Sequence, residues 1–275
     1  MDATRAEQRA LVTLRENVRV YAMDGALLGL FMISACLSVA LFEYPTSPLR
    51  QLIGSNFARR ALVGLAMGLT AVALIYSRWG KRSGAFMNPA MTLCFLRLGK
   101  LELVDAVGYI VAQFFGGTLG VAACALLFHA WVSHPAVNYV VTAPGAYGAA
   151  PAWLAELAIG FVMLTVVMSV NRVPRLAPYT GLFAAALVVL FITFEAPLSG
   201  MSLNPARSFA SAAIAASFRG FWIYLTAPIA GMLLGVEVQK RLDSRHERLC
   251  GKLNHSETVA CFVRCTCLDR TRKRK

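Results

Sequence analysis

The sequence reads SGAFMNPA at Ser83–Ala90 and SGMSLNPA at Ser199–Ala206. A second pattern, Tyr-x2-Ala-x3-Gly-x3-Gly, begins at Tyr109 after the first stretch and recurs at Tyr224 after the second. Matched landmarks in the same order and spacing are the signature of an internal repeat. The chain is therefore interpreted as two copies of one unit, each carrying an Asn-Pro-Ala motif.

Long apolar stretches determine the class of protein. The 275 residues are 57% hydrophobic and 15% charged, with a mean hydropathy of +0.59. A helix needs about 20 apolar residues to cross roughly 30 Å of hydrocarbon, and a soluble helix would keep one polar face. Six stretches carry almost no charge and are the candidate spans: Gly25–Leu41, Leu62–Ile75, Val104–Ala130, Trp153–Val170, Phe221–Val236 and the wholly uncharged Tyr179–Phe194. The sequence predicts a membrane protein.

Each Asn-Pro-Ala motif lies between two full spans, in a segment too short to cross the bilayer. These segments are Asn88–Leu98 and Asn204–Ala213. Eleven helical residues cover only about 16 Å, roughly half a bilayer. Because each unit holds three spans, the second unit is inverted, which puts the functional site near the midplane. We predict an all-α membrane protein with six transmembrane helices, two re-entrant half-helices and an inverted 3+3 repeat.

The arrangement of charge predicts the domain organisation. Residues 1–20 are a polar arm, 21–241 the membrane domain (repeats about 21–131 and 153–241), and 242–275 a basic tail. Lys and Arg occur after the second span and between the fourth and fifth, but not in 131–153 or 195–203. Basic loops stay in the cytoplasm, so both termini are expected there, with no cleaved signal peptide. The net charge of +13 indicates this topology and attraction to anionic lipid, not nucleic-acid binding.

The Asn-Pro-Ala motif is a compact helix start. Asn is a favoured N-cap, and Pro suits the first helical position. One copy would indicate only a capped helix, but two copies in half-spans aim two positive helix ends at the centre of the membrane. Cations are repelled there, and the amides of Asn88 and Asn204 are expected to donate to a passing oxygen. A water molecule that accepts both bonds cannot relay a proton.

The doubled motif, the Ser-Gly before each copy and NPARSF at Asn204–Phe209 resemble the aquaporin, or major intrinsic protein, family over about Tyr21–Arg241. The resemblance implies a passive channel for water and small uncharged solutes that excludes protons and ions. It also implies a homotetramer in the plasma (inner) membrane, with no cofactor and no enzymatic activity. The pore motif residues implied are Asn88, Pro89, Ala90, Asn204, Pro205 and Ala206.

Family members carry a four-residue selectivity filter. By offset, the matching positions here are Gly68, Ile192, Met201 and Arg207. Met67 replaces Gly68 if the loop Ser77–Ser83 contains a one-residue insertion. The set differs from the Phe/His/Cys/Arg of water channels and from the Trp/Gly/Phe/Arg of glycerol facilitators. A wide filter that is apolar on three sides is implied, open to water, glycerol, urea, ammonia and hydrogen peroxide.

Three further positions are interpreted through the resemblance. Asp24 and Glu156 match acids that support the half-helix loops by accepting backbone N–H groups. Phe86 stands where the family usually has His, so no titratable group is expected at that place.

The seven cysteines fall into two groups. Cys36, Cys94 and Cys124 lie singly in apolar stretches, where thiols behave as small hydrophobic groups. The others cluster with histidines in the tail, and a zinc site formed by Cys250, His255, Cys261 and Cys265 is one hypothesis. Free thiols in a basic tail and palmitoylation beside the last span are the alternatives.

Two other functional classes remain to be weighed. A glycerol-, urea- or ammonia-type facilitator with secondary water transport fits the same motifs. A secondary transporter also uses inverted repeats, but coupled transport usually needs an ionisable pair near the midplane, and Arg207 has no predicted carboxylate partner. No nucleophile–base pair or phosphate loop in the membrane region indicates an enzyme.

Overall fold

The computed structural model describes residues 3–242, with side chains from residue 12 onward. Within that part of the chain the structure is helical, without strands. Six helical segments have the length and hydropathy of membrane spans, which confirms the predicted number. The helices are α1 (Ala3–Glu43), α3 (Asn56–Tyr76), α6 (Leu103–Leu127), α8 (Ala149–Arg172), α9 (Thr180–Phe194) and α12 (Phe221–Leu242).

Two short helices start at the repeated motifs and confirm the predicted half-helices. They are α5 (Pro89–Arg97) and α11 (Pro205–Ile214). Short connecting helices make up the rest: α2 (Pro48–Leu52), α4 (Arg78–Ser83), α7 (His129–Val132), α10 (Ala196–Ser199) and the 3-10 turns η1 (Asn138–Val140) and η2 (Ala177–Tyr179).

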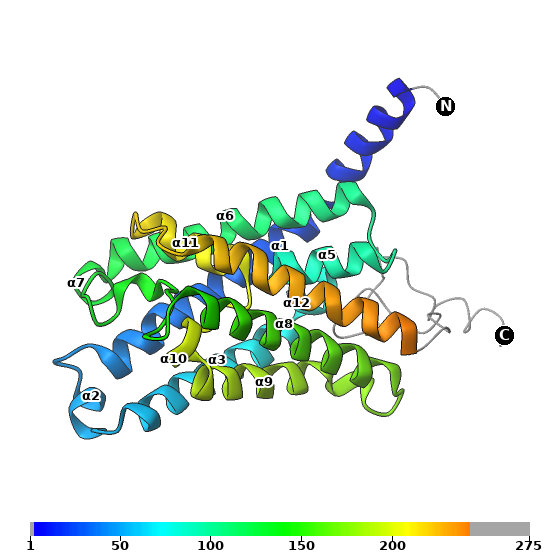
Figure 1. Ribbon diagram of the computed structural model, residues 1–275. Helices are drawn as coiled ribbons and strands as arrows, with labels where there is room; N and C mark the ends of the chain where they lie inside the picture. Colours follow the sequence, from blue (N-terminus) through cyan, green and yellow to red (C-terminus); the bar gives the residue numbers. More distant parts are fainter. Residues whose placement is uncertain (1–2, 243–275) are drawn as a thin grey trace.

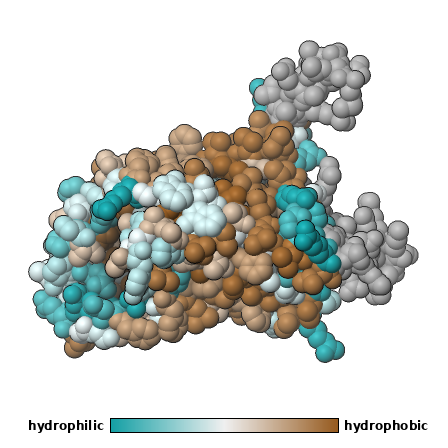
Figure 2. Space-filling view, viewed as in Figure 1, coloured by the Kyte–Doolittle hydropathy of each residue, from teal (hydrophilic) through white to brown (hydrophobic). Residues whose placement is uncertain are grey.

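The long helices run side by side in one bundle, with the start of α1 and the end of α12 at the same end (Figure 1). A broad hydrophobic band covers the middle of the visible face, and hydrophilic residues gather at both ends of the bundle (Figure 2). Large apolar side chains on the outside of α6, such as Phe115 and Leu119, are about two-thirds exposed. Such exposure of apolar area is expected where lipid covers the surface.

Helix α1 has no break at residue 20, where the sequence suggested a boundary between arm and span. It is one continuous 41-residue helix. The predicted tail, 242–275, falls outside the described residues except for Leu242, and so do the four cysteine and histidine positions of the zinc hypothesis.

Glycines hold the first and third long helix of each repeat in close contact. A Cβ added at Gly116 of α6 would lie 2.0 Å from the Gly25 carbonyl oxygen of α1. In the second repeat, a Cβ at Gly231 of α12 would lie 2.1 Å from the Leu157 carbonyl oxygen of α8. Close approach of backbones through small residues drives helix packing in lipid, where water provides no hydrophobic force. The repeated glycines therefore mark the same helix contact in both halves.

Candidate functional site

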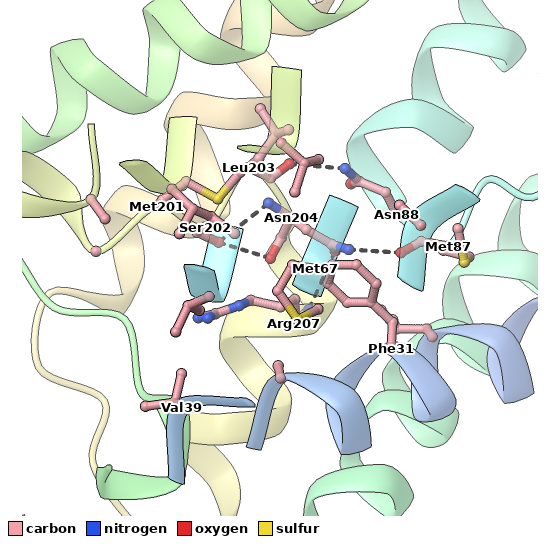
Figure 3. Close-up of a pocket in the computed structure, with 18 of the residues that line it drawn as sticks. Phe31, Val39, Met67, Met87, Asn88, Met201, Ser202, Leu203, Asn204 and Arg207 are labelled. Carbon is pink, nitrogen blue, oxygen red and sulfur yellow. Dashed lines mark hydrogen bonds between the residues drawn. The ribbon is translucent and has the colours of Figure 1, made fainter. Parts of the chain in front are cut away.

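A cavity of about 650 Å³ extends along the bundle between the two half-helix loops and the inner faces of the long helices. Both motif asparagines, Asn88 and Asn204, line it (Figure 3). The two half-helices therefore begin in one common space, as the inverted repeat predicts.

Each asparagine caps its half-helix in the same way. Asn88 Oδ1 accepts a hydrogen bond from the Ala90 N–H at 2.9 Å. Asn204 Oδ1 accepts from the N–H groups of Ala206 and Arg207 at 3.0 and 3.3 Å. Proline occupies the first helical position in both. The sequence interpretation of Asn-Pro-Ala as a capped helix start is confirmed.

The amide nitrogens of the two asparagines cross between the repeats. Asn88 Nδ2 donates to the Leu203 carbonyl at 2.8 Å, and Asn204 Nδ2 donates to the Met87 carbonyl at 2.7 Å (Figure 3). An amide –NH₂ carries two hydrogens, so one of each pair is already bonded. The second hydrogen of each amide is left over, so donation to a passing oxygen stays a prediction that these bonds do not contradict.

The residues before each asparagine share an unusual backbone. Ala85 and Met87 have φ values of 54° and 47°, and their repeat equivalents Met201 and Leu203 have 50° and 60°. Non-glycine residues rarely take left-handed conformations, which cost of order 1–3 kcal/mol each and persist only when surrounding contacts hold them. Two buried carboxylates supply such contacts.

In the first repeat the carboxylate is Asp24, which is fully buried. It accepts hydrogen bonds from Ser83 Oγ at 3.0 Å, from the Met87 N–H at 2.8 Å and from Gln113 Nε2 at 2.8 Å. Tyr109 completes the support, because its hydroxyl donates to the Ser83 carbonyl.

In the second repeat Glu156 takes the same role and is also fully buried. It accepts from Ser199 Oγ at 2.7 Å and from the N–H groups of Ser202 and Leu203 at 2.6 and 2.7 Å. The Tyr224 hydroxyl donates to the Ser199 carbonyl at 2.6 Å. The sequence showed that the tyrosines repeat but not why; each fixes the turn that precedes a motif.

Three of the four predicted filter positions line the cavity. Ile192, Met201 and Arg207 all line the cavity, and Arg207 Nη1 donates to the Val140 carbonyl at 3.0 Å. Gly68 does not line it, because a Cβ there would lie 2.5 Å from Val189 Cγ2 of α9. Met67 lines the cavity instead and is labelled among its lining residues in Figure 3. The offset that selected Gly68 is thus one residue too short.

A family model described as "Major intrinsic protein" matches residues 25–238. The chain belongs to the major intrinsic protein family. Aquaporin NIP1-2 of Arabidopsis thaliana is 33% identical over 180 residues, which is 64% of this chain and 60% of that protein. Aquaporin NIP2-2 of Zea mays is 33% identical over 217 residues, or 77% of this chain and 70% of that protein. The chain thus spans less than two-thirds of the Arabidopsis relative.

A solved structure supports the same fold. An X-ray structure of the aquaglyceroporin from Plasmodium falciparum superimposes with a TM-score of 0.66, covering 82% of this chain and 96% of that chain. Sequence identity is 19%, so this likeness bears on the fold alone.

One mouth of this major intrinsic protein carries charges that sequence reasoning missed. At the end of the bundle where α1 finishes, the cavity is lined by polar residues, here called the Glu43 mouth: Glu43, Arg50, Asn56, Arg59 and Arg60. The helical stripe Arg60, Val63, Met67, Ala71 was readable from the sequence at three- and four-residue spacing, and it points Arg60 along the same wall as Met67.

Two other predictions can be placed. Phe86, where the family usually has His, is buried between the rings of Phe95 and Tyr109, with centroids 4.9 and 5.0 Å away. Among residues 3–242 there is no group of three or more His, Cys, Asp or Glu side chains that could hold a metal ion.

Proposed function

We propose that this chain forms a passive transmembrane channel for water and small uncharged solutes that excludes protons and ions. One observation carries the proposal: two half-helices with Asn N-caps begin in a single cavity and are joined by reciprocal Asn88–Leu203 and Asn204–Met87 hydrogen bonds. Cofactors and catalysis have no part in it.

Exclusion of ions follows from the electrostatics of this meeting point. Each half-helix contributes about half a positive charge at its N-terminus, and Arg207 adds a full charge to the same cavity. Cations lose their hydration there without gaining acceptors of opposite charge. The remaining N–H of each motif asparagine donates to a water oxygen. A water molecule held in this way cannot relay a proton, so proton transfer along the row of water molecules is interrupted.

The filter that we propose comprises Met67, Ile192, Met201 and Arg207. Three of the four side chains are apolar. None of these three adds a second hydrogen-bond donor beside that of Arg207, as a histidine would. Solutes with a small apolar face, such as glycerol and urea, are accommodated together with water. This composition also supports the alternative of a glycerol-, urea- or ammonia-type facilitator in which water flow is secondary.

The assembly and location follow the family. We propose a homotetramer in which each subunit has its own pore, embedded in the plasma (inner) membrane with both termini cytoplasmic. Lipid is the partner of the apolar outer band. Chemical cross-linking in native membranes measures the subunit number, and protease accessibility of the termini measures the orientation.

Stopped-flow light scattering on proteoliposomes tests the transport proposal. We expect fast shrinkage in a sucrose gradient and fast re-swelling in glycerol and urea, with no ion gradient required. Rapid water flow with strict retention of glycerol and urea would contradict the broad filter. Flow that depends on an ion gradient would indicate a transporter instead.

A further inference from the structure

Two arginines of the cavity are anchored in the same way. Arg60 Nε donates to the Thr193 carbonyl at 2.8 Å, and Arg207 Nη1 donates to the Val140 carbonyl at 3.0 Å. Each guanidinium has five N–H donors. The other donors of both residues have no hydrogen-bond partner among the described residues, although the Arg60 guanidinium lies 5.9 Å from the Phe57 ring centroid.

The other two arginines of the Glu43 mouth are both paired with Glu43. Arg59 is buried, and its Nε donates to both Glu43 carboxylate oxygens at 3.1 and 3.2 Å. Its remaining nitrogens donate to the Ile53 and Gly54 carbonyls and to Asn56. Arg50 Nε lies 3.6 Å from the same carboxylate.

The cavity therefore has an excess of positive charge in a defined place. Four arginines line it, and Glu43 is the one acidic residue of its lining within the described part of the chain. Because that carboxylate is shared by Arg50 and Arg59, no acid of the cavity lining remains to pair with Arg60 or Arg207, although the buried Glu156, outside the lining, attracts Arg207 electrostatically. A guanidinium with unused N–H pairs matches the oxygens of a carboxylate or phosphate.

Arg60 lies outside the proposed filter. It precedes Met67 by seven residues on the cavity-lining stripe of α3, which is about 10 Å along a helix. An anion held by Arg60 would thus stand at the Glu43 mouth, outside the filter and in the path of any solute, while Arg207 attracts it from the inner side.

We propose that Arg60, with Arg207 behind it, forms a binding site for small oxyanions that obstructs the channel. The ligand class is a planar or tetrahedral oxyanion, such as a carboxylate or inorganic phosphate. The obstruction rests on the proposed function, whereas binding itself does not.

Inorganic phosphate is the probe. Proteoliposomes hold equal phosphate on both sides, with chloride replaced at constant ionic strength and pH, and osmotic water flow is measured. In the unmodified protein we expect a saturable decrease of flow with phosphate. Arg60→Gln should weaken the apparent phosphate affinity at least tenfold. Arg60→Lys keeps the charge but lacks the paired N–H donors of a guanidinium, so its phosphate affinity should lie between those of the unmodified protein and Arg60→Gln.

Arg50→Gln is the matched control, because it removes the same charge from the same mouth at a residue paired with Glu43. It should change the phosphate affinity less than threefold. Equal effects of Arg50→Gln and Arg60→Gln would overturn the site in favour of diffuse attraction. Phosphate-insensitive flow in the unmodified protein would overturn it as well.

Binding is measured separately from flow by the melting temperature of the detergent-solubilised protein in phosphate and in chloride. We expect phosphate to raise it in the unmodified protein and not in Arg60→Gln. Stabilisation that Arg60→Gln abolishes, in a protein that conducts no water, would support the site and refute the proposed channel.

Discussion

The third residue after each motif asparagine is Met91 in α5 and Arg207 in α11, and both line the cavity. Everything around them is duplicated: the asparagine cap, the left-handed turns, the buried acid and the supporting tyrosine. The two half-helices thus share a scaffold, but at this cavity-lining position one side chain is apolar and the other is charged. We infer from this comparison that the repeated residues build the walls of the cavity, while residues that break the repeat set its charge.

The largest expected effect comes from removing the scaffold acids. Asp24→Ala and Glu156→Ala each leave three buried donors without their acceptor, including one or more backbone N–H groups of the strained turns. At about 1–3 kcal/mol per orphaned donor, either loss should cost roughly 4 kcal/mol and leave little folded protein. Thermal melting in detergent measures this, with Asp24→Asn and Glu156→Gln as intermediates. If one of the two alanine variants kept the melting temperature of the unmodified protein, the two repeats would not be equivalent in this respect.

A smaller effect is expected from substituting Glu195. This acid has no counterpart in the first repeat, where Trp79 occupies the equivalent position. Glu195 lies between α9 and α10, is 8% exposed, and neither carboxylate oxygen has a hydrogen-bond partner in the described chain. Burial, reinforced by the negative charge of Glu156, raises the pKa of Glu195 from 4.5 to about 7.

A raised carboxyl pKa means that the folded state holds the proton more tightly than the unfolded state. Stability from this group is therefore lost as pH rises from about 4.5 to 7 and stays lost above, an effect of roughly 3 kcal/mol. Glu195→Gln should raise the melting temperature at pH 8 but not at pH 4. Equal shifts at both pH values would contradict the assignment.

Exchanging the third residues after the motif asparagines, Met91 and Arg207, tests the comparison directly. Arg207→Met makes the two half-helices alike at this position. We expect proton and cation leakage to rise by about two orders of magnitude, because the repulsion between Arg207 and a passing cation, roughly 3 kcal/mol at about 5 Å and an effective dielectric constant near 20, is removed. A pH-sensitive dye inside proteoliposomes measures it. Met91→Arg is the reverse change and should reduce water flow. Tight exclusion of protons by Arg207→Met would assign exclusion to the helix dipoles alone.

The smallest effect is expected from narrowing the proposed filter at Ile192. Ile192→His adds a donor and a ring to the cavity wall, so glycerol flow should fall about three- to tenfold relative to water flow. Ile192→Val keeps the wall apolar and serves as control. Equal changes of glycerol and water flow would mean that Ile192 does not discriminate between them.

Much of the scaffold was accessible from the sequence because its signals are local. Asn-Pro-Ala predicts a helix start from the chemistry of one asparagine and one proline, and the glycine spacing predicts a helix contact from the absence of side chains. The repeat then doubles each signal. Arg207, as a lone charge in an apolar segment, was identified for the same reason.

Other features depend on how helices rotate and where loops return. Counting back from Asn88 selected Gly68, but the rotation of α3 turns Gly68 toward α9 and Met67 toward the cavity. Neither the asparagine amides crossing to Leu203 and Met87 nor the anchoring of Arg60 on Thr193 could be counted along the chain.

The sequence by itself determined six spans, two half-helices, their inversion and the acids that match between repeats, because hydropathy, capping and repetition act over neighbouring residues. Only the tertiary structure decided which residues face the pore. A side chain's direction depends on the rotation of its helix against its neighbours, and a hydrogen bond such as Asn88 to Leu203 joins residues 115 positions apart. The charged Glu43 mouth arises for that reason, since it is assembled from helices and loops that meet only after folding.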